Sequence, residues 1–113
     1  MKLLLASGSK TRAEILKKAK IGFKVVDHGV DEEELKISLN ELNPKDISIQ
    51  LSEMKAIKPS MKYFEDFVIG ADQVLDFNGS LINKAAHLQE AKKQLLDLSG
   101  KKHKLITSIT IAK

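Results

Sequence analysis

An acidic residue that follows an apolar run is the first feature of this sequence that predicts chemistry. Residues 67–75 read Phe-Val-Ile-Gly-Ala-Asp-Gln-Val-Leu, and the β-branched members indicate a buried strand. The run ends in Gly-Ala-Asp, which would place the Asp72 carboxylate at a strand end where a ligand can approach bare backbone. We expect Asp72 to take part in catalysis. A carboxylate that caps the following turn explains this motif equally well.

A second group of polar residues lies at an expected strand-to-helix turn. Ser7, Ser9 and Arg12 follow the apolar residues 3–6, and Ser9 is a good helix N-cap. A helix N-terminus attracts anions, and hydroxyl and guanidinium donors suit phosphate oxygens. The spacing is not that of a Walker loop. A plain capped helix explains the serines as well as a phosphate site does.

Three further charged residues are candidates for the same site. Glu32 lies in residues 27–40, an acidic segment expected to be irregular, and with Asp72 it offers the oxygen ligands that Mg²⁺ prefers. Composition alone favours a solvated acidic loop there. Lys55 falls at the border of an apolar helix face and Lys84 follows an expected hairpin, so both can reach a polyphosphate. Solvent-exposed lysines are nevertheless commoner, and helical spacing favours that outcome for Lys55.

The elements that must position these residues form an α/β domain with a mixed sheet flanked by helices. Periodicity predicts helices over residues 10–20, 43–58 and 86–98, with Pro59 ending the second. Asn78-Gly79 predicts a hairpin after the central strand. The strands are expected at residues 3–6, 23–26, 67–75, 81–82 and 104–111. Nothing follows the last strand to cover it or to pair its edge.

Composition limits the classes of protein to consider. A chain of 113 residues with 42% hydrophobic and 30% charged residues is a single globular domain, and no apolar run reaches membrane-spanning length. The absence of cysteine excludes disulfides and thiolate metal sites. A net charge of +4 with 4% aromatic residues gives little support to nucleic-acid binding. We expect a cytoplasmic protein, since no export signal is recognisable.

Six segments, in this order and spacing, resemble the Maf family of nucleoside triphosphate pyrophosphatases. Lys10, Thr11 and Ala85 depart from the residues that the family often has at those positions, but the charged positions match. The segments are residues 4–16 (L-A-S-x-S-x-x-R-x-x-[LI]-L in the family), 30–32 (V-D-E), 51–56 (L-A-x-x-K-A), 68–74 (V-I-G-A-D-x-V), 83–84 (K-P) and 98–107 (L-S-G-x-x-H with a later threonine).

The resemblance implies a Maf/ITPase-like fold and metal-dependent hydrolysis of nucleoside triphosphates to a monophosphate and pyrophosphate. It implies a divalent cofactor, Mg²⁺ or Mn²⁺, held by Glu32 and Asp72, with Asp72 also the proton acceptor. The expected phosphate-binding residues are Ser7, Ser9, Arg12, Lys55 and Lys84. Such enzymes are cytoplasmic, are viewed as sanitising the nucleotide pool, and have been linked to septum formation. Nucleoside triphosphate is the expected partner, with no nucleic acid or membrane; a homodimer is one assembly to expect.

The resemblance also predicts that residues 1–113 are the N-terminal portion of such a domain, truncated at the C-terminus. Family members continue with a segment that completes the nucleotide pocket. We therefore expect the 113-residue chain to be weakly active or inactive by itself. The alternative function is that of an inactive remnant that binds nucleotide, or that binds a protein partner by strand addition to its last strand.

Overall fold

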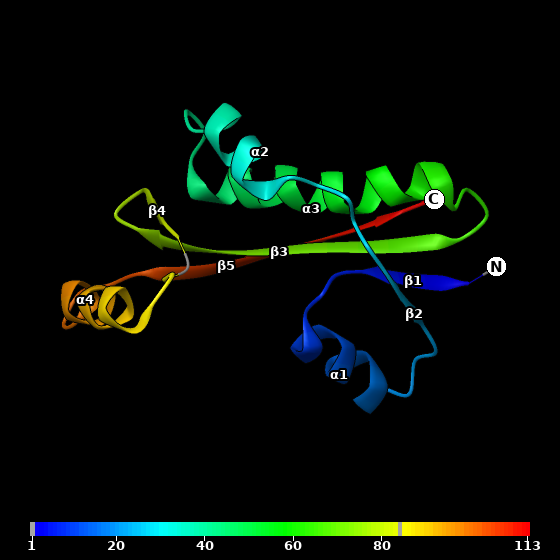
Figure 1. Cartoon of the computed structure of the whole chain (residues 1–113), viewed down its shortest axis with the longest axis horizontal. Helices are drawn as coiled ribbons and strands as arrows, with labels where there is room; N and C mark the ends of the chain where they lie inside the picture. The colour runs from blue at the N-terminus through cyan, green and yellow to red at the C-terminus, as the bar shows by residue number, and fades with distance from the viewer. Residues whose placement is uncertain (1, 84) are drawn as a thin grey trace.

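A computed structural model describes residues 2–83 and 85–113 and has five strands and four helices in this part of the chain (Figure 1). Three strands run parallel and two antiparallel, which confirms the predicted mixed α/β fold. The strands are β1 (Leu3–Ala6), β2 (Lys24–Val26), β3 (Phe67–Phe77), β4 (Ser80–Ile82) and β5 (Lys104–Ala112). The helices are α1 (Lys10–Lys18), α2 (Glu32–Ser38), α3 (Pro44–Lys62) and α4 (Leu88–Leu98).

Strand β3 is the centre of the sheet. Its first residues pair in parallel with β1, which in turn pairs with β2, and its last residues pair with β4 across the hairpin. β5 pairs antiparallel with β3 from Val68↔Ala112 to Asp76↔Lys104, so it occupies the opposite edge of β3. The last strand is therefore paired along one edge, by β3, and no other strand of the described residues pairs with its second edge.

Helix α3 packs closely on one face of this sheet because Gly70 has no side chain. A Cβ at Gly70 would lie 2.5 Å from the Ala56 amide nitrogen and 2.5 Å from the Ser52 carbonyl oxygen. The Ser48 hydroxyl donates to Ser108 Oγ at 2.9 Å, and Ser52 and Thr110 share a 2.9 Å hydrogen bond. Even-numbered residues of β3 and β5 thus face α3, whereas α1 and α4 lie on the other side of the sheet (Figure 1).

Several predicted local signals are confirmed. Ser9 and Asn43 cap α1 and α3, each by accepting a hydrogen bond from a first-turn backbone N–H. The β3–β4 hairpin turns at Asn78 and Gly79, which both have positive φ. The Asp76 carboxylate accepts a 2.8 Å hydrogen bond from the Gly79 N–H and fixes this turn. No helix in the described part of the chain is long and apolar enough to cross a membrane.

Three local expectations are wrong. The acidic segment is not irregular throughout, because Asp31 caps a short helix, α2, through its side chain. Pro59 does not end α3, which continues to Lys62 with the proline ring buried. Asp72 lies within the eleven-residue β3 and not at a strand end. In each case packing or a cap extends regular structure beyond a local signal.

The two helices on the other side of the sheet, α1 and α4, are less buried than their apolar spacing predicts. α1 and α4 contain no fully buried residue. α1 ends at Lys18, two residues before the expected end at residue 20, and Lys20 takes a left-handed conformation. The tightly packed core is therefore the β1–β3–α3 layer, which includes Leu4, Leu51 and Val68.

Candidate active site

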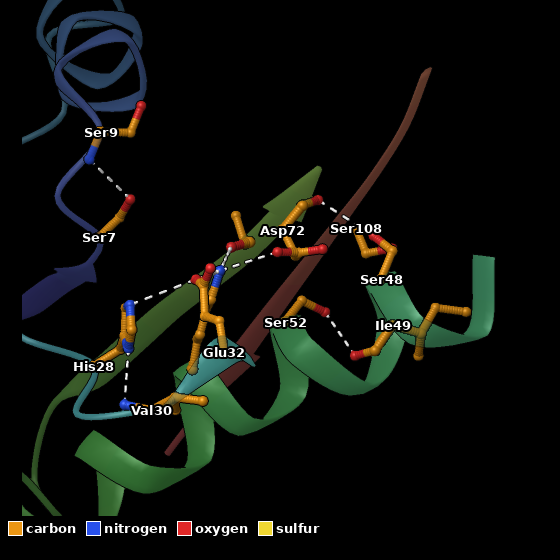
Figure 2. Close-up of polar contacts among 12 residues, drawn as sticks. Ser7, Ser9, His28, Val30, Glu32, Ser48, Ile49, Ser52, Asp72 and Ser108 are labelled. Atoms are coloured by element: carbon orange, nitrogen blue, oxygen red, sulfur yellow. Dashed lines mark hydrogen bonds and ion pairs between the residues drawn. The ribbon is translucent and has the colours of Figure 1, made fainter. Parts of the chain in front are cut away.

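The most buried charged group of the described residues joins α3 to β3. The Lys55 ammonium lies 3.0 Å from Asp72 Oδ1 and also forms an ion pair with Glu32 Oε1. The side chains of Lys55 and Asp72 are 6% and 7% exposed. Figure 2 shows the carboxyl groups of Glu32 and Asp72 approaching the same point above α3. The favoured expectation of a solvent-exposed Lys55 is wrong, because the close approach of α3 at Gly70 brings this lysine against β3.

Glu32 is held as a carboxylate by its cationic neighbours. Partial burial raises its pKa, but the hydrogen bond and charge of Lys55, with the charges of Lys36 and His28, outweigh burial and hold the pKa below its usual value of 4.5. His28 Nε2 lies 3.8 Å from Glu32 Oε1, while His28 Nδ1 accepts a 2.9 Å hydrogen bond from the Val30 N–H. That second contact orients the imidazole toward Glu32 (Figure 2).

The turn between β1 and α1 supplies a group of donors. Ser7 is buried, and its Oγ accepts hydrogen bonds from the Ser9 N–H at 3.1 Å and from Arg12 Nη1 at 3.0 Å. A hydroxyl has two acceptor positions and one proton, so the Ser7 O–H proton remains able to donate to a ligand. Ser9 Oγ accepts from the Arg12 N–H as the helix cap. The capping interpretation is therefore confirmed for Ser9. Ser7 orients Arg12, and a phosphate site at this turn stays a prediction.

The donors of the β1–α1 turn and the ion-paired residues around Lys55 line one cavity of about 330 Å³. Six of the predicted site residues, which come from four separate parts of the chain, line this cavity. They are Ser7, Ser9, Arg12, Glu32, Lys55 and Asp72. Only the tertiary structure brings them together. The remaining predicted residue, Lys84, lies outside the described residues. Eight further residues line the cavity, and four of them have polar side chains that were not among the predicted site residues, namely His28, Lys36, Gln73 and Asn83.

No local signal in the sequence would have found most of these additional residues. His28 has no ligand spacing to another histidine, and Lys36 lies on a helix that the sequence analysis did not expect. Asn83 and Gln73 belong to the segments 83–84 and 68–74, but their residue types alone did not predict that they line the site. Their common position around one cavity follows from the meeting of α2, β3 and the β4 end.

The donor set of this cavity fits a hard divalent cation. Within residues 2–83 and 85–113, no three acidic or histidine side chains converge as a ready metal site. Asp72 Oδ2 is nevertheless buried and has no hydrogen-bond partner among the described residues. Mg²⁺ commonly uses one or two carboxylates and takes its other ligands from water and substrate phosphates. Glu32 and Asp72 satisfy that requirement.

Comparison with known proteins places this arrangement in a family. The chain is 47% identical over 111 residues to a nucleoside triphosphate pyrophosphatase of Caulobacter vibrioides, covering 96% of this chain and 55% of that protein. It is 41% identical over 113 residues to the Pelagibacter ubique protein of the same description, covering 98% and 58%. It is also 39% identical over 109 residues to a 7-methyl-GTP pyrophosphatase of Bartonella henselae, covering 96% and 55%.

The chain spans little more than half the length of these curated relatives. A family model described as Maf-like protein matches residues 2–113, which include β1, α3, β3 and the residues that line the cavity. The resemblance noted in the sequence is thereby confirmed, and this chain is a member of the Maf-like protein family.

Proposed function

We propose that this chain carries the phosphate- and metal-binding part of a site that hydrolyses nucleoside triphosphates to a monophosphate and pyrophosphate. The observation that carries the proposal is the convergence of the Ser7–Arg12 donors and the buried Lys55–Asp72 pair on one cavity. Relatives at 39–47% identity are described as nucleoside triphosphate or 7-methyl-GTP pyrophosphatases. Hydrogen-bond donors beside carboxylates suit hydrolysis of the phosphoanhydride bond, because the donors stabilise the charge that develops on the phosphate oxygens.

Each residue has a role that follows from its chemistry. Arg12 presents a planar fork to phosphate oxygens, and the Ser7 hydroxyl, which already orients Arg12, donates its proton to the same anion. The carboxylate of Asp72 accepts a proton from the attacking water and orients it. A divalent cation bound by Glu32 and Asp72 would offset the negative charge that develops on the departing pyrophosphate. Ser9 contributes by holding the start of α1 in place.

The test is pyrophosphate release by the purified 113-residue chain with Mg²⁺ or Mn²⁺, across canonical and modified nucleoside triphosphates. We expect metal-dependent release, slower than the roughly 1–10³ s⁻¹ of typical enzymes because the chain covers about 55% of its relatives. Asp72→Asn preserves the shape of the side chain but removes the proton acceptor, so release should disappear. Asp97→Asn, an exposed change on α4, should leave it unaltered.

Release that persists in Asp72→Asn would contradict the proposed role of that residue. A folded wild-type chain that neither releases pyrophosphate nor binds a nucleoside α,β-imidotriphosphate with Mg²⁺ would contradict the proposed function. Circular dichroism of both variants shows whether a loss of release reflects a loss of fold.

A second candidate function is strand addition by a protein partner at β5. One edge of β5 pairs with β3, and its other edge has no strand beside it among the described residues. Exposed edges of this kind pair with extended peptides. Asp72→Asn should leave partner binding at β5 unchanged, whereas it should abolish pyrophosphate release. This variant therefore separates the two candidate functions.

A further inference from the structure

The Lys55 ammonium is fully occupied by protein oxygens. Nζ contacts Glu32 Oε1, lies 3.0 Å from Asp72 Oδ1 and makes a long 3.5 Å contact with the Ala71 carbonyl oxygen. An ammonium group has three donors, and these three partners use all of them. Lys55 therefore has no donor left for a substrate phosphate unless one of these contacts breaks.

The two carboxylates that Lys55 neutralises are the same two that fit a divalent cation. A cation that bridged Glu32 Oε1 and Asp72 Oδ1 would lie between the same two oxygens as the ammonium nitrogen. Two cations so close together repel each other strongly in a partly buried site. The ammonium and the metal are therefore alternatives at this position and not neighbours.

We propose that Lys55 is a tethered counterion that competes with the divalent cation for Glu32 and Asp72, and that the metal displaces its ammonium toward bound phosphate. Ser7 and Arg12 line the same cavity, so an anion held there offers the displaced ammonium a new partner. By linkage, phosphate binding then strengthens metal binding and the reverse. This inference shares the metal ligands of the proposed function, but it concerns metal binding and not turnover.

The first test measures Mn²⁺ binding to the 113-residue chain without phosphate, by the electron paramagnetic resonance signal of free Mn²⁺. Lys55→Met removes the competing charge and keeps an unbranched side chain. We expect it to bind Mn²⁺ roughly tenfold more tightly than the wild type. Lys55→Arg, which keeps the charge, and Lys62→Met, which removes an exposed charge two turns along α3, should bind as weakly as the wild type.

Equal or weaker Mn²⁺ binding by folded Lys55→Met would overturn the proposal, as would equal tightening in Lys62→Met. The latter result would assign the effect to net charge alone. Lys55→Met leaves two carboxylates close together, so its folding is checked by circular dichroism with and without Mn²⁺. We expect Mn²⁺ to raise its melting temperature more than that of the wild type.

A second measurement on the wild-type chain does not depend on that variant folding. A buried, ion-paired ammonium exchanges its protons slowly, so the Lys55 Nζ signal should appear in ¹⁵N spectra of lysine ammonium groups. We expect Mg²⁺ to shift or abolish this signal over the concentration range in which it binds, and Glu32→Gln to weaken that response. Mg²⁺ binding that leaves the Lys55 signal unchanged would overturn the proposal.

The two sets of experiments separate the proposals from each other. Tighter Mn²⁺ binding in Lys55→Met, together with a wild-type chain that neither releases pyrophosphate nor binds the nucleoside α,β-imidotriphosphate, would support the counterion and contradict the proposed function. Release that requires Asp72, together with unchanged Mn²⁺ binding in Lys55→Met, would give the opposite result.

Discussion

The two faces of the sheet are built on opposite principles. The face covered by α3 buries polar residues, among them Ser48, Ser52, Lys55 and Asp72, each no more than 5% exposed when the whole residue is counted. The opposite face presents apolar side chains to solvent: Leu105, Ile109 and Ile111 of β5 are 64–68% exposed. Alternation along the strands places these two sets on opposite sides.

This contrast teaches that close packing, and not hydropathy alone, decides which side chains on the two faces are buried. The polar face is tight because Gly70 lets the backbone of α3 reach β3 and because hydroxyl pairs satisfy the buried serines. Such burial is tolerated only where partners are complete. The apolar face has two helices on its side, but neither contributes a buried residue.

The largest expected effect on this contrast comes from a substitution that forces α3 away from the sheet. Gly70→Ala adds a Cβ 2.5 Å from backbone atoms of α3, which cannot move as a flexible side chain would. We expect a loss of about 3 kcal/mol in the free energy of unfolding. Gly22→Ala is the control, because its Cβ would meet nothing within 4 Å. Equal urea midpoints for the two variants would contradict the close packing of α3.

The same polar substitution on the two faces should have different effects. Val74 is 5% exposed on the α3 side, so Val74→Thr buries a hydroxyl and should cost about 2 kcal/mol. Ile109 is 68% exposed on the other side, and Ile109→Thr should cost less than about 0.5 kcal/mol. Urea denaturation measures both. If Ile109→Thr destabilised the chain as much as Val74→Thr, the open face would have to be covered in solution.

The smallest expected effect is on the pH dependence of stability, through Glu32. Because cationic neighbours hold its folded pKa below 4.5, Glu32 stabilises the fold above that pH and loses this contribution as pH falls through the folded pKa. Glu32→Gln should therefore show a shallower loss of stability than the wild type between about pH 6 and about pH 3.5. Glu34→Gln, an exposed change on the same helix, should show the same dependence of the free energy of unfolding on pH as the wild type. If the free energy of unfolding fell equally with pH in Glu32→Gln and the wild type, the ionisation of Glu32 would not contribute to stability.

Much of the fold was predictable because its signals are local. The Ser9 and Asn43 caps, the Asn78-Gly79 hairpin and the apolar run of β3 depend on residues within a few positions of one another. α2 was missed because its three consecutive glutamates favoured a solvated loop, although Asp31 offered a cap. The helix beyond Pro59 was missed because burial of the proline on the sheet is a tertiary effect.

The sequence by itself determined the family, the order of the elements apart from α2, and the chemical types at the site, since motif spacing along the chain is enough for these. Only the tertiary structure decided that Lys55 is buried between Glu32 and Asp72 and that Ser7 and Arg12 share their cavity. Helical spacing favoured solvent for Lys55, because periodicity describes a helix face but not what packs on it. The absent side chain of Gly70 sets how closely α3 approaches β3, and with it the pairing of Lys55 with Asp72.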